Sequence, residues 1–169
     1  PKIKFNSNEL LIIDYIENNN IKDKNYQIIL AEEILKIHQN TNEKYGFKFD
    51  SQIGALKQKN EFTDNWVIFF REKRLNSIFE LINNDDPMTN NINQKIEKLL
   101  KNIHNLIPNN PIPRLLHGDL WAGNILYNNG KLVGLIDPGI FFGHNELEIA
   151  YLTWFNFVNE EFLKIYSNI

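Results

Sequence analysis

The amino-acid sequence predicts an α+β fold that is mainly helical and contains a few short strands. Apolar residues recur three and four positions apart over residues 26–39, 64–82 and 91–107, which is typical of helices with one buried face. In the final third, two short apolar runs flank Asn129 and Gly130, and an Asn-Gly pair in this setting is a strong hairpin signal.

Length, composition and charge limit the class of protein. The 169 residues suit one compact domain or a piece of a larger one. The chain is 43% hydrophobic and 23% charged, as in ordinary folded proteins, which excludes disordered and fibrous classes. A net charge of −3 without a dense Lys/Arg cluster argues against nucleic acid as a partner. No apolar stretch approaches the roughly 20 residues that span a bilayer, so we expect no membrane partner either.

Two further features bear on location and completeness. The sequence has no cysteine, which excludes disulfides, thiol nucleophiles and cysteine-based zinc sites and agrees with the cytoplasmic location that we expect. The chain begins at Pro1, and an apolar run already follows at residues 10–16. We therefore expect a fragment of a longer protein.

The first half of the chain predicts one strand and two helices. The apolar run at residues 10–16 lies between Asn-rich segments, which indicates a buried strand. Residues 26–39 follow as a helix whose apolar face includes His38, and we interpret His38 as a core histidine with a backbone partner. A second helix over residues 64–82 should bury Trp66, while the charged residues 71–74 should lie on its solvated face.

The later segments predict a third helix, an extended passage and a last helix. Residues 91–107 carry an apolar stripe that we assign to the core. Three prolines within residues 108–113 then favour extended backbone. The last helix begins near Asn145 and should turn an apolar face that includes Trp154 toward the core.

Three oxygen-bearing side chains near the hairpin suit phosphoryl transfer. Asp119 lies in an irregular loop, Asn124 follows five residues later, and Asp137 ends the second strand of the hairpin. Antiparallel pairing about a turn at Asn129 returns Asp137 to the neighbourhood of Asn124. Phosphoryl transfer needs a base for a hydroxyl nucleophile and oxygen ligands for Mg²⁺, and these three residues can supply both. Pro138 should hold Asp137 in an extended conformation.

The same region permits a different metal site. His117, Asp119 and His144 compose the two-histidine, one-carboxylate set that binds Fe(II) in oxygenases. Such sites normally line a β-barrel, whereas long amphipathic helices dominate this chain. The helical pattern therefore favours the phosphoryl-transfer interpretation.

Several motifs together resemble one family. The sequences HGDLWAGN at residues 117–124, LIDPG at 135–139 and GHNELEIA at 143–150 are similar to those of the fructosamine kinase (ketosamine 3-kinase) family, which is related to the aminoglycoside phosphotransferases and has a protein-kinase-like fold. YGFKFDSQIG at 45–54 and DNWVIFFREKRL at 64–75 extend the resemblance over most of the chain.

The resemblance implies a role for each residue of the motifs. Asp119 would be the catalytic base toward a sugar hydroxyl, and Asn124 and Asp137 would be Mg²⁺ ligands. His117 and Glu148 would support the catalytic loop. The family usually carries Asp at the position of Glu148.

The resemblance also implies how the chain is divided. It would be the C-terminal, large lobe of a kinase-like fold without its N-terminal lobe. Residues 1–17 would be a remnant of the small lobe and the hinge, and residues 18–169 the helical large lobe with the catalytic hairpin. In the hinge segment of Asp14, Tyr15 and Ile16, the C=O of Asp14 and the N–H of Ile16 would pair with the adenine of ATP.

The implied function is ATP-dependent and Mg²⁺-dependent phosphorylation of a ketosamine sugar hydroxyl. The acceptor would be a fructosamine or ribulosamine, free or attached to a glycated protein lysine. The sequence contains no Gly-rich phosphate loop, so we expect weak or no turnover from this chain. Two alternatives stay open: a non-catalytic remnant or binding module, and a kinase for another small molecule of the aminoglycoside or choline type.

Overall fold

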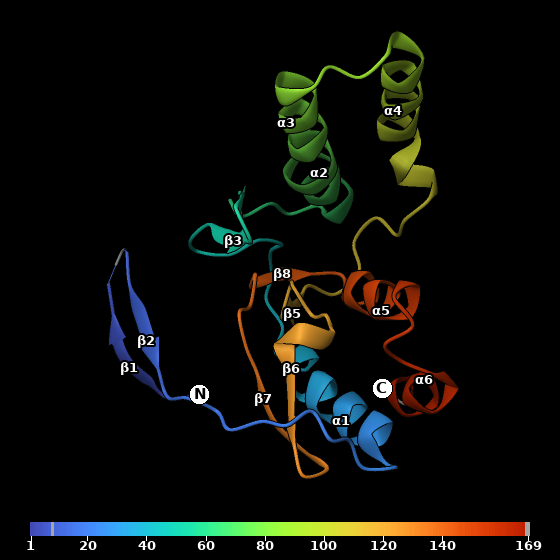
Figure 1. The fold of residues 1–169 in the computed structure, drawn as a ribbon. Helices are drawn as coiled ribbons and strands as arrows, with labels where there is room; N and C mark the ends of the chain where they lie inside the picture. The colour runs from blue at the N-terminus through green and yellow to red at the C-terminus, as the bar shows by residue number, and fades with distance from the viewer. Residues whose placement is uncertain (8, 168–169) are drawn as a thin grey trace.

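The computed structural model describes residues 1–7 and 9–167 and has an α+β fold (Figure 1). Its described strands form two-stranded antiparallel sheets that pair β1 with β2, β3 with β4, β5 with β8, and β6 with β7. In chain order the main elements are β1 (Ile3–Asn6), β2 (Leu11–Ile13), α1 (Tyr26–His38), β3 (Ser51–Ile53), β4 (Leu56–Gln58), α2 (Trp66–Phe70), α3 (Ser77–Asp85), α4 (Asn90–Asn102), β5 (Arg114–Leu116), β6 (Ile125–Asn128), β7 (Lys131–Leu135), β8 (Phe141–Gly143), α5 (Asn145–Trp154) and α6 (Glu160–Tyr166).

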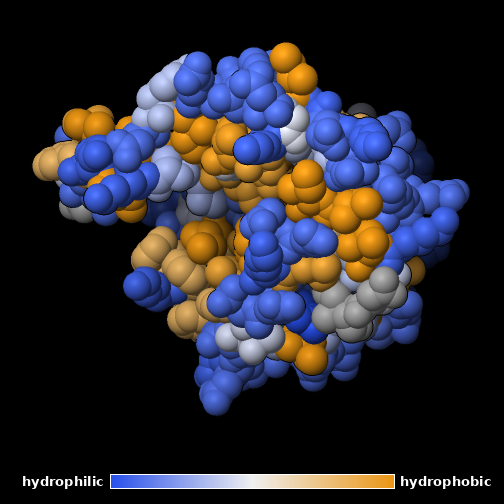
Figure 2. Space-filling view, turned by 90° about the horizontal axis from the view of Figure 1, so that it is seen from below, coloured by the Kyte–Doolittle hydropathy of each residue, from blue (hydrophilic) through white to orange (hydrophobic). Residues whose placement is uncertain are grey.

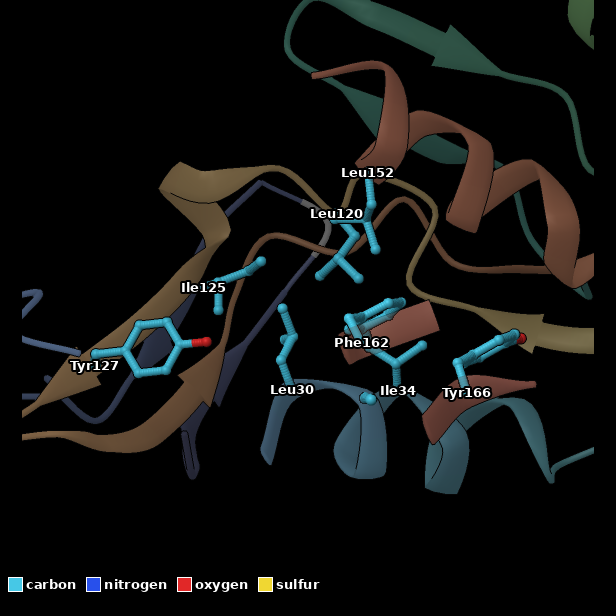
Figure 3. Packing of buried hydrophobic residues seen from close by; sticks show 9 residues of the cluster. Leu30, Ile34, Leu120, Ile125, Tyr127, Leu152, Phe162 and Tyr166 are labelled. Atoms are coloured by element: carbon cyan, nitrogen blue, oxygen red, sulfur yellow. The ribbon is translucent and has the colours of Figure 1, made fainter. Parts of the chain in front are cut away.

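The main core joins the first helix to the last third of the chain. Helix α1 is confirmed close to its predicted bounds, and it packs against the hairpin β6–β7 and the helices α5 and α6 (Figure 3). The residues of this cluster are Leu30, Ala31, Ile34, Leu120, Ile125, Tyr127, Leu152, Phe162 and Tyr166. Because Leu120 belongs to this core, the loop that carries the preceding Asp119 is fixed to it.

A second core lies under the strand pair β5–β8. It consists of Tyr45, Trp66, Phe69, Leu116 and Phe141, which are all at most 2% exposed. The pair β5–β8 places Leu116 opposite Phe141 in antiparallel register. The end of β5 and the start of β8 are therefore held side by side. The loop that carries Asp119 begins at the end of β5, and the loop that carries Asp137 ends at the start of β8.

The predicted hairpin is confirmed. Strands β6 and β7 pair from Ile125 opposite Leu135 to Asn128 opposite Lys131. Asn129 and Gly130 both have positive φ, 48° and 83°, as a two-residue turn of type I′ requires. The hairpin brings its two ends, next to Asn124 and Asp137, to the same side of the molecule.

The predicted second helix is continuous, but its hydrogen-bonding pattern changes from α-helical to π-helical and back. Asn65 caps α2 by accepting a hydrogen bond from the N–H of Ile68 at 2.9 Å. A π-helical turn, η1 (Arg71–Asn76), then joins α2 to α3. The prediction that residues 71–74 form a solvated face is wrong for Arg74, which is only 5% exposed. Its guanidinium lies over the rings of Phe69 and Phe141, which explains how the core accommodates it.

Two predicted core faces are more exposed than the sequence pattern indicated. Helix α4 stands apart from α5, α6 and α1 (Figure 1), and Ile92 and Leu99 on its apolar stripe are 44% and 38% exposed. At the end of α5, Trp154 is 83% exposed. Within the described residues, no helix is long and apolar enough to cross a membrane.

The prediction of a buried strand over residues 10–16 is wrong in both extent and burial. Only Leu11–Ile13 is a strand, β2, and it pairs with β1 in a hairpin that projects from the body of the protein (Figure 1). Leu11 and Ile12 are 56% and 46% exposed, and apolar side chains are visible on the projecting segment at the left of Figure 2. Apolar composition identified a strand, but the described residues provide no second layer to cover it.

Candidate active site

The loop after β5 makes a tight turn at Gly118. Gly118 has a φ of +82°, a region that disfavours side chains. A Cβ atom at this position would lie 2.3 Å from the carbonyl oxygen of Gly139. The backbones of the two loops that carry Asp119 and Asp137 are therefore in direct contact, and only glycine permits this approach at residue 118.

The buried carboxylate of Glu148 holds this loop from helix α5. Its Oε1 accepts a hydrogen bond from the N–H of Gly118 at 2.7 Å, and its Oε2 accepts one from the N–H of His117 at 3.2 Å. Oε2 also lies 2.9 Å from Nε2 of His38. Hydrogen bonds to an ionised group are stronger than neutral ones. A glutamate therefore reaches two consecutive amides of the loop at a position where the family resemblance led us to expect aspartate.

His38 has side-chain partners, so the expectation of a backbone partner is wrong. Its Nδ1 lies 2.6 Å from the hydroxyl of Tyr166, and Nδ2 of Asn145 donates to that hydroxyl at 2.7 Å. Since the Tyr166 oxygen accepts from Asn145, its proton is available to His38 Nδ1, and His38 Nε2–H then donates to Glu148. Helices α1, α5 and α6 thus join in one buried polar network that ends at the loop.

His117 is buried beside these groups. Burial lowers its pKa below the ordinary histidine value, while the charges of Glu148, Asp119 and Asp137 oppose that shift. Its Nδ1 lies 3.4 Å from the backbone nitrogen of Asp119, so the ring adjoins the loop that begins at His117. A neutral imidazole in this position fills buried space and accepts a hydrogen bond from the backbone N–H of Asp119.

The structure brings Asp119 and Asn124 into contact. Nδ2 of Asn124 donates to the backbone oxygen of Asp119 at 2.8 Å and to its carboxylate Oδ2 at 3.2 Å. The backbone oxygen of Asn124 accepts a hydrogen bond from the N–H of Ile136 at 3.0 Å. Asp137, the next residue, is therefore adjacent to Asn124 along the hairpin, and the three predicted residues lie in one neighbourhood.

The backbone of Asp137 differs from the prediction. Its φ is +53°, in the left-handed region, whereas Pro138 led us to expect an extended conformation. Aspartate tolerates this region better than most residues, but the conformation is still strained. Asp137 is exposed, and among the described residues its carboxylate takes part in neither a hydrogen bond nor a salt bridge.

The donor set suits Mg²⁺ better than iron. Asn124 directs its amide nitrogen to Asp119, which leaves its Oδ1 without a hydrogen-bond partner in the described part of the chain. The carboxylate of Asp137 and the amide oxygen of Asn124 are of the kind that Mg²⁺ binds, and Mg²⁺ keeps further positions for water and phosphate. Within residues 1–7 and 9–167, no three His, Asp or Glu side chains could share a metal ion, so the alternative set of His117, Asp119 and His144 is not assembled.

A cavity of about 320 Å³ opens beside Asp119. One wall is the helix formed by α2, η1 and α3, and the other is the start of α5; most of the lining side chains are apolar. Tyr151 also lines it, and burial together with the negative charge of Asp119 raises the pKa of its phenol. The sequence motifs did not identify Tyr151, although its spacing of three residues from Glu148 would have placed both on one face of a helix.

A second cavity, of about 330 Å³, adjoins the predicted adenine segment. It is lined by residues 13–16 together with Asn18, Leu126 and Ile136. The side chain of Ile16 packs closely over Gly134 of β7. The C=O of Asp14 and the N–H of Ile16 have no hydrogen-bond partner among the described residues, whereas the carboxylate of Asp14 pairs with Lys4 at 3.0 Å. Tyr15 also lines the cavity, although its side chain is 85% exposed.

The chain is similar to known proteins along nearly its whole length. A family model described as fructosamine kinase matches residues 4–169. A "Probable ketoamine kinase" of Enterococcus faecium is 33% identical over 163 residues, which cover 94% of this chain and 56% of that protein. The chloroplastic protein-ribulosamine 3-kinase of Arabidopsis thaliana is 34% identical over 146 residues, which cover 85% of this chain and 44% of that protein. The chain spans about half the length of these curated relatives.

Solved structures share the fold. A crystal structure assigned as a fructosamine-3-kinase from Thermobifida fusca matches 99% of this chain and 57% of its own chain, with a TM-score of 0.83 and 23% identity. Another, from Haemophilus somnus, matches 89% of this chain and 50% of its own, with a TM-score of 0.73 and 27% identity. The α+β arrangement described above is therefore that of about half of each of these structures.

Proposed function

Since this chain belongs to the fructosamine kinase family, we propose that it is the large, catalytic lobe of an ATP-dependent kinase that phosphorylates a sugar hydroxyl of a ketosamine. The acceptor would be a fructosamine or ribulosamine, free or on a glycated lysine of a protein. Residues 1–17 would belong to the small lobe and the hinge, and residues 18–169 to the large lobe.

The observation that carries this proposal is the contact between Asp119 and Asn124 at the end of the hairpin that bears Asp137. Asn124 touches Asp119 through its side chain and touches the residue before Asp137 through its backbone. Asp119 keeps a carboxylate oxygen, Oδ1, that no described group hydrogen bonds. This arrangement supports Asp119 as the base and Asn124 and Asp137 as the two oxygen ligands that phosphoryl transfer requires.

Each residue then has a defined role in the reaction. The acceptor would occupy the cavity beside Asp119, where the Asp119 carboxylate orients the sugar hydroxyl and accepts its proton. Asn124 and Asp137 would hold Mg²⁺, which supplies positive charge to the phosphate oxygens. Glu148 fixes the loop through His117 and Gly118, so Asp119 needs little rearrangement during the reaction.

The hinge segment would hold the nucleotide in the cavity that it lines together with Leu126 and Ile136. The free C=O of Asp14 and N–H of Ile16 match the donor and acceptor on the edge of an adenine. Ile136, the residue after β7, lines this cavity. The adenine ring would therefore lie beside the residue that precedes the metal ligand Asp137. This arrangement supports ATP as the phosphate donor.

The test is nucleotide-dependent stabilisation followed by transfer. A ligand that binds only the folded state raises the melting temperature, and at about 100 times its Kd the stabilisation is roughly 2.7 kcal/mol. We expect Mg²⁺-ATP to raise the melting temperature of the chain, Asp137→Ala to abolish the rise, and the exposed variant Asp86→Ala to retain it.

The same proteins distinguish the remaining functions. Transfer from radiolabelled ATP to an N-alkyl fructosamine, lost in Asp119→Asn, would establish the kinase. Transfer to an aminoglycoside or to choline alone would assign another small-molecule kinase. No melting shift at any concentration of Mg²⁺-ATP would support a non-catalytic chain and contradict the proposal.

A further inference from the structure

We propose that Ser51, Asn60 and Arg74 form a buried polar clamp that positions the segment of Asp137, Pro138, Gly139 and Ile140 and thereby the metal ligand Asp137. The clamp is built from three parts of the chain that lie outside the catalytic loop and the hairpin: strand β3, the segment after β4, and the π-helical turn η1. The inference rests on the proposed function, because it assigns these residues to the metal site of that reaction.

Asn60 is the centre of the clamp. Its side chain is fully buried, and its Nδ2 lies within hydrogen-bond distance of the carbonyl oxygen of Ile140 at 3.3 Å and of Ser51 Oγ at 3.0 Å. Ser51 Oγ in turn lies 3.3 Å from the carbonyl oxygen of Gly139 and 3.4 Å from Oε1 of Gln58, and the Gly139 carbonyl is the nearer acceptor for its proton. Two consecutive carbonyls of the segment after Asp137 are therefore held by side chains from another region. Hydrogen bonds between buried polar groups restrict the geometry of the segments that they join.

Arg74 locks Asn60 in this orientation. Its Nη2 donates to Asn60 Oδ1 at 2.6 Å, and its Nη1 donates to the carbonyl oxygen of Lys59 at 2.9 Å. Because Asn60 Oδ1 accepts from Arg74, Nδ2 must face Ser51 and Ile140. The guanidinium carbon also lies 4.1 Å from the ring centre of Phe141, the residue that follows the segment. Arg74 thus contacts the segment through Asn60 and through Phe141.

The location of Arg74 is itself unusual. It lies within the π-helical turn, and such turns inside helices are frequently found at functional sites. Its buried Nε has no hydrogen-bond partner among the described residues, and its side chain lines the cavity beside Asp119. The helix therefore buries a cation at a cost in desolvation, between the predicted acceptor cavity and the segment of the metal ligand.

The clamp is needed because the backbone of Asp137 is strained and its side chain is not held by any described group. Its φ of +53° is unfavourable, and its carboxylate has no partner in the described part of the chain. The residue must therefore be held by its neighbours along the chain. On the N-terminal side the bond from Ile136 to Asn124 does this. On the C-terminal side, Ser51 and Asn60 hold the carbonyls of Gly139 and Ile140, in addition to the backbone contact of Gly118 with Gly139 and the pairing of Phe141 with Leu116. Loss of the side-chain hydrogen bonds would let Asp137 relax away from Asn124.

The experiment measures Mn²⁺ binding to the chain, with free Mn²⁺ followed by electron paramagnetic resonance and no nucleotide present. Asn60→Asp keeps the size of the side chain and the acceptor for Arg74, but it turns an oxygen toward the carbonyls of Ile140 and Phe49. Loss of a residue that orients a metal ligand typically weakens metal binding 10–100-fold. We expect the Kd for Mn²⁺ to rise by about 10-fold or more in Asn60→Asp.

A matched control and a second variant separate positioning from folding. Asn65→Asp makes the same chemical change at a helix cap, where Asp and Asn serve equally well, and should leave the Kd unchanged. Ser51→Ala removes one hydroxyl and should raise the Kd by a smaller factor; it supplies the measurement if Asn60→Asp does not fold. In an Asp137→Asn background, Ser51→Ala should no longer change Mn²⁺ binding, although it should still lower the melting temperature.

Three outcomes decide the matter. Weaker Mn²⁺ binding that depends on Asp137 supports the clamp. An unchanged Kd in Ser51→Ala and Asn60→Asp, with only the melting temperature lowered, overturns it and leaves the proposed function intact. A chain that does not bind Mn²⁺ through Asp137 at all overturns both.

Discussion

The hydroxyl of Tyr166 lies 2.6 Å from Nδ1 of His38, which is 128 residues earlier in the chain. Through His38 and Glu148, this contact connects the last described helix to the backbone of the loop that carries Asp119. The side chains of Tyr166, His38 and Glu148 are all buried, so their polar atoms must find hydrogen-bond partners within the protein. It makes the position of the loop depend on the packing of α1, α5 and α6.

Replacing Tyr166 with Phe removes the hydroxyl and leaves the ring. His38 Nδ1 and Asn145 Nδ2 would lose their partner, and an unsatisfied buried group costs about 1–3 kcal/mol. We therefore expect the free energy of unfolding to fall by about that amount in urea titrations. Tyr15→Phe, at a side chain that is 85% exposed, should change it by less than about 0.5 kcal/mol. Equal effects of the two variants would contradict the network.

Glu148→Gln tests the other end of the same network. The amide would keep one acceptor oxygen but would place an NH₂ group against a donor, either Gly118 N–H or His38 Nε2–H. We expect a loss of about 1–3 kcal/mol in the free energy of unfolding, and faster amide hydrogen exchange at Gly118. Glu146→Gln, at an exposed carboxylate of the same helix, should cost less than about 1 kcal/mol. Slow exchange at Gly118 in Glu148→Gln would show that other contacts hold the loop.

Local patterns in the sequence predicted the elements whose formation is local. The helix α1 follows from its apolar spacing, and the hairpin β6–β7 follows from the Asn-Gly pair at its turn. The motif residues Asp119 and Asn124 could be assigned to one site because only five residues separate them.

Burial and partners could not be predicted in the same way, because they depend on segments far apart in the sequence. His38 has its partners on α5 and α6, and Arg74 is buried only because Asn60 and Phe141 reach it. Residues 10–13 are as apolar as a core strand, yet no described layer covers them. Asp137 departs from the extended conformation that Pro138 favours, and the hydrogen bonds on either side of it, from Ile136 to Asn124 and from Ser51 to Gly139, join segments that no local pattern relates.

Gly118→Ala tests the contact between the two loops. A Cβ atom would lie 2.3 Å from the carbonyl oxygen of Gly139. The backbone at Gly139 cannot move without disturbing the strand pair β5–β8, which begins two residues later. Gly54→Ala is a matched control, since Gly54 also has positive φ, +55°, but has no atom within 4 Å of the added Cβ. The control should lose about 1–2 kcal/mol for the unfavourable φ alone. Gly118→Ala should lose clearly more, and equal losses in urea unfolding would show that the loops are not in contact.

The pH dependence of stability provides a test of the buried His117. Burial lowers its pKa in the folded state below the value of about 6.5 that it has when unfolded. The unfolded chain therefore binds more protons in this range, and stability is fully present above about pH 6.5 and is lost as the pH falls toward the lowered folded pKa. His144, whose pKa is also lowered mainly by burial, contributes in the same direction. Each group can contribute a slope of at most about 1.4 kcal/mol per pH unit.

Urea unfolding between pH 7.5 and 5.5 measures this slope. We expect the free energy of unfolding to decrease toward pH 5.5 in the unmodified chain, and His117→Gln to flatten the decrease because the variant has no group that titrates there. His144→Gln should remove a smaller part, since His144 is only partly buried. A slope that is the same in His117→Gln as in the unmodified chain would mean that the ring of His117 takes up protons in the folded state as readily as in the unfolded state.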